Sequence, residues 1–111
     1  REMGEVGTTK IYENDKIIMW EFILEPGERT PMHTHKHDYV FHALEGAPLQ
    51  VFDINNKDLG TLPVGNGDTY AFKIEGDNLV STDGKGHSVP VTHAAVNKGT
   101  ARYREILVES K

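Results

Sequence analysis

The sequence predicts a small all-β domain, a sandwich or a closed barrel, with little or no helix. Apolar residues recur with a period of two, and no helix-period pattern persists for three turns. Turn residues interrupt the alternation about every eight to twelve positions. With 111 residues, the chain has the size of one domain. Short strands at this spacing are typical of sandwiches and barrels rather than of α/β folds.

The first strand is expected at 16–24, where Trp20, Phe22 and Leu24 share one face and Pro26-Gly27 ends the run. Each later run stops at a cluster of Gly, Asn, Asp or Pro, which are the usual turn residues. The later strands are expected at 39–44, 49–54, 59–64, 69–74, 89–96 and 101–109. We take 1–15 as an N-terminal arm or edge strand, so that about eight strands form one barrel domain over 16–111.

Composition excludes several kinds of site and partner. The chain has no cysteine, so it has no disulfide, thiolate metal site or cysteine nucleophile. A net charge of −5 and the absence of a basic run argue against nucleic acid and anionic membranes as partners. No segment has the roughly 18 apolar residues of a membrane span. The opening residues, 1–5, have no apolar segment typical of an export signal, and we expect a cytoplasmic location.

The histidines are the residues with the clearest chemical signal. Four of the six lie within ten residues, at positions 33, 35, 37 and 42. On a strand, residues i and i+2 point to the same face, so His33 and His35 can present two imidazoles to one point. Imidazole is a common ligand of divalent transition metals. The segment can equally be a polar loop, since short motifs produce many false matches.

A third ligand has to come from another strand, and His93 is the candidate. It lies among Val91, Ala94 and Ala95, an apolar run in which a free histidine would be out of place. In a barrel, an early and a late strand can be neighbours. His37 is expected at the rim, after a turn, and His42 is expected on the outer face of its strand. His87 lies in a glycine-rich loop and is expected to be solvated or to close over a cavity mouth.

Two segments resemble the sequence motifs of the cupin family. The spacing of Gly27, His33, His35, Tyr39 and Gly46 resembles the first motif, and His93 followed by Asn97 resembles the end of the second. The proline and glycine that usually precede the second-motif histidine appear here only as Val-Pro-Val-Thr at 89–92. The resemblance covers roughly 20–108. His-Asp-Tyr-Val at 37–40 resembles a subset of small cupins in the RmlC-like jelly-roll superfamily.

The resemblance implies a double-stranded β-helix, or jelly-roll barrel, with a metal ion inside that is bound by His33, His35 and His93. It also implies a homodimer, formed through the outer face of one sheet. The fourth ligand of the family is usually a glutamate, and Tyr39 occupies that position here. Tyr39 is therefore a candidate metal ligand or catalytic residue. Core packing beside Phe41 and Ala43 is the alternative interpretation of this side chain.

Three neutral imidazoles leave the charge of a divalent ion uncompensated, which favours a small anionic, chelating ligand. The ion can be Fe, Mn, Ni or Zn. We expect a metal-dependent oxygenase, isomerase or lyase in which Tyr39 donates or accepts a proton. A non-catalytic binding module or sensor, and a structural dimer whose metal pins the barrel, remain as alternatives because this fold serves many functions.

Overall fold

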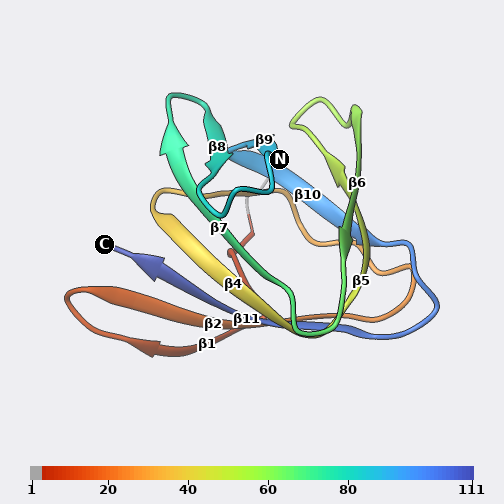
Figure 1. Ribbon diagram of the computed structural model, residues 1–111, viewed down its shortest axis with the longest axis horizontal. Coiled ribbons are helices and arrows are strands. Elements are labelled where there is room, and N and C mark those ends of the chain that lie inside the picture. The colour runs from red at the N-terminus through yellow and green to blue at the C-terminus, as the bar shows by residue number, and fades with distance from the viewer. Residues whose placement is uncertain (1–3) are drawn as a thin grey trace.

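The computed structural model describes residues 4–111 and consists of two antiparallel sheets that lie face to face (Figure 1). Residues 1–3, the start of the expected arm, lie outside the described residues. The strands are β1 (Thr9–Glu13), β2 (Ile17–Leu24), β3 (His33–Thr34), β4 (Asp38–Glu45), β5 (Ala47–Phe52), β6 (Asp58–Val64), β7 (Thr69–Glu75), β8 (Asn78–Ser81), β9 (Ser88–Pro90), β10 (Thr92–Asn97) and β11 (Tyr103–Ser110). Within residues 4–111, no helix is long and apolar enough to cross a membrane.

The order of the strands is that of a double-stranded β-helix. The larger sheet has the order β1-β2-β11-β4-β7-β8-β9, and the smaller sheet has the order β3-β10-β5-β6. The last strand, β11, therefore lies between two early strands, β2 and β4, as Figure 1 shows. In the same view β5, β6 and β10 face β4 and β7 across the interior. The all-β prediction is confirmed.

The late segment 89–96 is not one strand, as predicted, but two. Its first part, β9, pairs with β8 in the larger sheet, and its second part, β10, pairs with β3 and β5 in the smaller sheet. The change of sheet falls at Val91, directly after Pro90, whose nitrogen has no hydrogen to donate to a ladder. The short strand β8 was also not predicted. It pairs with β7 through the turn at Gly76, whose φ is 62°.

The interior is filled by the alternating side chains of the larger sheet and by the facing residues of β5. Seven aromatic residues are buried in it, namely Trp20, Phe22, Tyr39, Phe41, Tyr70, Phe72 and Tyr103. Several of these rings contact one another, for example Phe41 and Tyr70, which stack at 5.1 Å between centroids. These rings belong to one apolar cluster that forms the core of the barrel.

Two positions of the first motif require glycine for different reasons of backbone geometry. Gly27 follows Pro26 in a turn closed by the hydrogen bond from Glu28 N–H to Glu25 O (2.9 Å), and its φ of 81° is the value that the third residue of a type II turn requires. Gly46 has no such φ. A Cβ atom at this position would lie 2.4 Å from the carbonyl oxygen of Val64, so the close approach of two chains excludes a side chain there.

Asn97 holds together the end of β10 and is predicted to be a large contributor to stability. Its side chain is fully buried, donates to the carbonyls of Leu24 and Ala101 (both 2.9 Å), and accepts from Gly99 N–H (2.8 Å). Asn97→Ala leaves three backbone groups without their partner, which is expected to lower the free energy of unfolding by about 2–4 kcal/mol. Urea titration measures this loss.

The matched control is Asn78→Ala, because Asn78 is exposed on β8 and its side chain makes no hydrogen bond within the described residues. An exposed substitution of this kind is expected to change the free energy of unfolding by about 0.5 kcal/mol or less. Equal effects of the two substitutions would contradict the role given to Asn97.

Candidate metal centre

Strands β3 and β10 bring the three candidate histidines together. The two strands pair antiparallel, with His33 directly opposite His93. His35 lies one residue beyond the end of β3, where its N–H donates to the carbonyl of Val91 (2.8 Å) and continues the pairing with the chain before β10. Because His33 and His35 are two residues apart along an extended chain, their side chains point to the same face, toward the interior.

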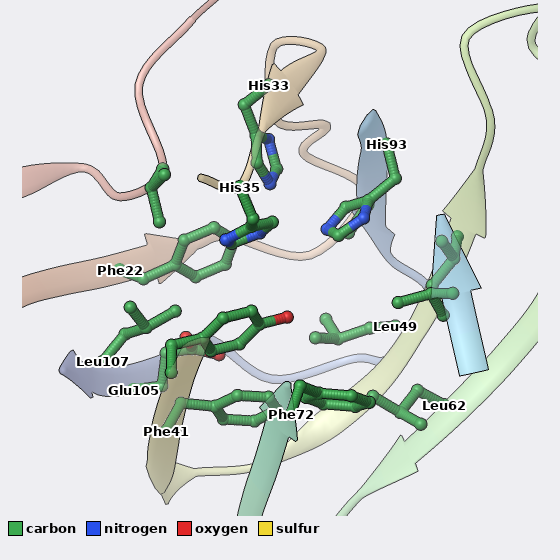
Figure 2. A pocket seen from close by; sticks show the side chains of 15 residues that line it. Phe22, His33, His35, Phe41, Leu49, Leu62, Phe72, His93, Glu105 and Leu107 are labelled. Atoms are coloured by element: carbon green, nitrogen blue, oxygen red, sulfur yellow. The ribbon is translucent and has the colours of Figure 1, made fainter. Parts of the chain in front are cut away.

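The three imidazoles form a nearly equilateral triangle. Their ring centroids lie 4.7 Å apart for His33 and His93, and 5.0 Å apart for each of the pairs that include His35. One nitrogen of each ring lies within 4.8 Å of the others, and all three residues are buried. Figure 2 shows the rings turned toward one another at one end of a pocket. This is a geometry in which three rings can share one ion.

Hydrogen bonds to the backbone orient two of the rings. The Nδ1 atom of His33 lies 3.0 Å from the carbonyl of Pro31, and that of His93 lies 2.7 Å from the carbonyl of Pro90. A carbonyl oxygen only accepts, so Nδ1 carries the hydrogen in both rings and the lone pair is on Nε2. Histidines that bind metal ions usually make this kind of second contact. These two residues therefore fit a metal ion.

His35 differs from the other two because its Nδ1 atom is buried and has no hydrogen-bond partner among the described residues. A buried polar atom without a partner costs about 1–3 kcal/mol. The ring is held instead by stacking on Tyr39, with 4.4 Å between centroids and 19° between planes. The unpaired nitrogen beside two oriented imidazoles supports the fit of an ion at this point.

Burial keeps the three imidazoles neutral at pH 7. It lowers the pKa of His33, and it lowers the pKa of His93 to about 4, with a smaller contribution from the charge of His33. The pKa of His35 is lowered well below 6.5, first by burial and then by the charges of His93 and His33. Only a neutral imidazole has a lone pair to offer, so the set is ready for a metal ion without the loss of a proton.

Tyr39 lies in the wall of the same pocket, inward from β4, beside Phe41 and Phe72. It is therefore both packed in the core and adjacent to the histidines, so both interpretations from the sequence describe part of its position. Burial raises its pKa well above 10, and the negative charges of Glu105 and Glu109 raise it further. In these surroundings the phenol keeps its proton and is a hydrogen-bond donor.

The pocket is a small, mostly apolar cavity inside the barrel, with a volume of about 70 Å³. This is room for a few water molecules or a few non-hydrogen atoms of a ligand. Ten of the fifteen lining residues are apolar, among them Phe22, Leu49 and Leu62. The five others are the three histidines, Tyr39 and Glu105. A ligand in this cavity thus meets polar groups at few points.

Glu105 is a residue of the site that sequence reasoning missed. It lies on β11, is 4% exposed, and lines the cavity together with Leu107. The signal was present in the alternation, because Glu105 shares the inward parity of Tyr103 and Leu107 within the run 101–109. An acidic residue on the buried face of a strand is uncommon and points to a specific role.

The other three histidines lie outside the triangle. His42 is exposed on the outer face of β4, with its Nδ1 atom 2.8 Å from the hydroxyl of Thr69, as its parity predicted. His37 is half-buried in the bend before β4, away from the three-histidine group. His87 packs against the ring of Tyr70 at 5.5 Å between centroids and is not part of the cavity lining. Its side chain is half-buried in the glycine-rich loop.

No protein-family model and no curated protein matches the sequence. Solved structures do match. A cupin domain from Bordetella pertussis Tohama I has 20% sequence identity and a TM-score of 0.69, and the alignment covers 99% of both chains. The chain has the cupin fold. This agrees with the double-stranded β-helix that the two motifs implied.

Two other solved structures with this fold are named as enzymes. A sugar phosphate isomerase of the cupin superfamily from Silicibacter pomeroyi has 22% sequence identity and a TM-score of 0.54. The alignment covers 87% of this chain and 52% of the isomerase. The polyketide cyclase RemF from Streptomyces resistomycificus has 20% sequence identity and a TM-score of 0.55. The alignment covers 91% of this chain and 61% of the cyclase. This chain thus spans about half to three fifths of those proteins, and the likeness concerns the fold.

Proposed function

We propose that this cupin-fold protein binds one divalent transition metal ion, Fe, Mn, Ni or Zn, through His33, His35 and His93, and uses it to act on a small anionic molecule. The observation that carries the proposal is the convergence of three buried, neutral imidazoles at one end of an otherwise apolar cavity. Oxygenation, isomerisation and elimination are the reaction types that such a centre supports. We propose that the chain is one barrel domain, 16–111, preceded by an N-terminal arm or edge strand at 1–15.

When bound, the ion would supply Lewis acidity, or redox chemistry in the case of iron, at a site with positions open to a ligand. The chain's own residues do the rest. The carbonyls of Pro31 and Pro90 hold two imidazoles in the tautomer that leaves Nε2 free. The mostly apolar walls lower the local dielectric constant, which strengthens electrostatic interactions inside the cavity. Tyr39, protonated and stacked on His35, is the proposed catalytic residue, with a hydroxyl that can donate a hydrogen bond to the ligand.

Two other functions use the same residues. A binding module or sensor would hold the ligand without turnover, and a structural centre would use the ion only to pin β3 to β10. The cavity beside the histidines favours the first of these over the second, because a structural metal centre is usually closed by four protein ligands. The described group contains three.

The experiment begins with metal analysis of the isolated protein and reconstitution with Fe(II), Mn(II), Ni(II) and Zn(II), one at a time. We expect one ion per chain and a change in the spectrum of the bound Ni(II) or Fe(II) on addition of small carboxylates or hydroxy acids. Turnover of any of them separates an enzyme from a binding module. A spectrum that no ligand alters favours a structural ion, and less than a stoichiometric amount of every metal contradicts the proposal.

We also propose a homodimer that forms through the outer face of the larger sheet. Val40 and Leu44 of β4 are 39% and 44% exposed there, and Val108 of β11 lies directly beside Val40. Val40→Glu places a charge between these exposed valine and leucine side chains and is expected to convert the dimer to a monomer in sedimentation-velocity experiments. The matched control is Ile54→Glu, which is 47% exposed after β5, outside this face. A monomeric wild-type protein at micromolar concentration would contradict the dimer.

A further inference from the structure

Glu105 occupies a particular position in the cavity, away from the histidines. On β11 it lies between Phe22 of β2 and Ala43 of β4, its partners in the two ladders. Its side chain points inward and lines the cavity. In Figure 2 it lies across the pocket from His33 and His93, beside Leu107 and Phe41. A ligand that reaches the metal centre therefore shares the cavity with this carboxyl group.

The carboxyl group has one hydrogen bond within the described residues. The hydroxyl of Tyr103 donates to its Oε1 atom, and no donor reaches Oε2. Apart from the three histidines, the titratable groups near Glu105 and its partner Tyr103 are Glu109 on β11, Tyr39 on β4 and Tyr70 on β7. Among residues 4–111, no lysine or arginine lines the cavity. Glu105 is thus a buried acid without a positive partner, with one oxygen available to a ligand.

Glu109 provides a comparison on the same face of the same strand. It is 2% exposed, but its Oε1 atom accepts a hydrogen bond from the indole N–H of Trp20 (2.7 Å), and it does not line the cavity. Its role is explained by this contact. Glu105 has no comparable donor for Oε2 and faces the space where a ligand would lie. The two glutamates therefore differ in their surroundings although they share a strand.

Two further observations define what Glu105 can do. Its carboxyl is not part of the group of donor atoms around His33, His35 and His93, so it is not placed to be a fourth ligand. Burial raises its pKa to about 8, against which the hydrogen bond from Tyr103 acts only partly. The acid is therefore mostly protonated at pH 7 and close to the point at which it gains or loses a proton, as a general acid or base requires.

We propose that Glu105 exchanges a proton with the ligand that this cavity holds against the metal centre, an inference that rests on the proposed function. In one direction the O–H bond of Glu105 breaks, the proton moves to a basic atom of the ligand, and the electron pair stays on the carboxylate. The hydroxyl of Tyr103 then donates to a charged rather than a neutral acceptor, which is the stronger hydrogen bond. In the other direction the carboxylate removes a proton from the ligand.

The first test uses infrared spectroscopy of the metal-free protein, with D₂O as the probe. The wild type is expected to show the C=O band of a protonated carboxyl at pH 7, to shift it promptly in D₂O, and to lose it with a midpoint near pH 8. Glu105→Gln lacks the band, and Glu109→Gln, the matched control, retains it. A band that Glu105→Gln keeps, or that D₂O does not shift, overturns the assignment.

The second test adds formate to the zinc-loaded protein. If formate lies between the ion and Glu105, its affinity falls more steeply with pH in the wild type and in Glu109→Gln than in Glu105→Gln, by about tenfold per pH unit above the pKa of Glu105. Equal pH dependence in all three proteins overturns the inference. Failure to bind zinc overturns the proposed metal centre instead, and the infrared test still decides whether Glu105 is an accessible, protonated acid.

Discussion

Replacing His93 by alanine is expected to weaken zinc binding roughly a hundredfold. Structural zinc ions are bound with about 10–16 kcal/mol, so one of about four ligands contributes about 3 kcal/mol, which is roughly a hundredfold in Kd. The rings of His33 and His93 face each other across β3 and β10, with 4.7 Å between centroids. The measured loss of zinc affinity therefore also includes any movement of the His33 ring when its neighbour is removed. Competition with a chromophoric chelator at pH 7.5 measures the change in Kd.

His42→Ala is the matched control, since His42 is a histidine of the same chain that lies exposed on the outer face of β4. It is expected to leave the Kd for zinc unchanged. Circular dichroism of both variants shows whether the barrel is retained. If His93→Ala folds and binds zinc as tightly as the wild type, the ion is bound elsewhere and the site is wrong.

Acid is expected to destabilise the metal-free protein through His93. Its pKa is about 4 in the folded chain because of burial, against 6.5 ordinarily. Between these values the unfolded chain takes up a proton that the folded chain does not, so folding loses stability as the pH falls. The stabilising contribution is complete above about 6.5 and is lost by about 4. Since one pH unit corresponds to about 1.4 kcal/mol, the total is about 3 kcal/mol.

Glu105 acts in the opposite direction. Its pKa is raised from 4.5 to about 8 in the folded chain, so its contribution is complete below about 4.5 and is lost as the pH rises to about 8. The pH dependence of the free energy of unfolding in the wild type therefore combines the opposing contributions of His93 and Glu105. A comparison with the His93→Gln variant separates the contribution of His93. Urea unfolding at pH 7 and pH 4 is expected to show the wild type losing about 3 kcal/mol relative to His93→Gln. A difference that is constant over this range would contradict the burial of a neutral His93.

Much of the fold could be predicted because its strands have one buried and one outward face. In Asp38–Glu45 and Thr69–Glu75 apolar residues stand at every second position, and the buried residues are among them, for example Tyr39 and Phe41. The juxtaposition of the histidines was also predictable, since the two-residue spacing of His33 and His35 fixes a common face. Both features depend on residues that are close together in the chain, so a single sequence is enough to predict them.

The features that were missed depend on pairing between distant segments. The strand breaks at Val91 because the residues before it pair with β8 in one sheet and the residues after it pair with β3 in the other. No local sequence pattern shows that a strand changes sheets. The importance of Glu105 was missed because its environment is assembled from β2, β4 and β11, three segments far apart in the chain. Its inward parity was visible, but the cavity that it faces was not.

The most direct measurement of the central claim is an anomalous-difference map at the zinc absorption edge, from crystals of the zinc-loaded protein. We expect one strong peak per chain at the centre of the triangle of His33, His35 and His93, about 2.0–2.1 Å from one nitrogen of each ring. No peak at this point, or peaks only on exposed histidines such as His42, would contradict the metal centre.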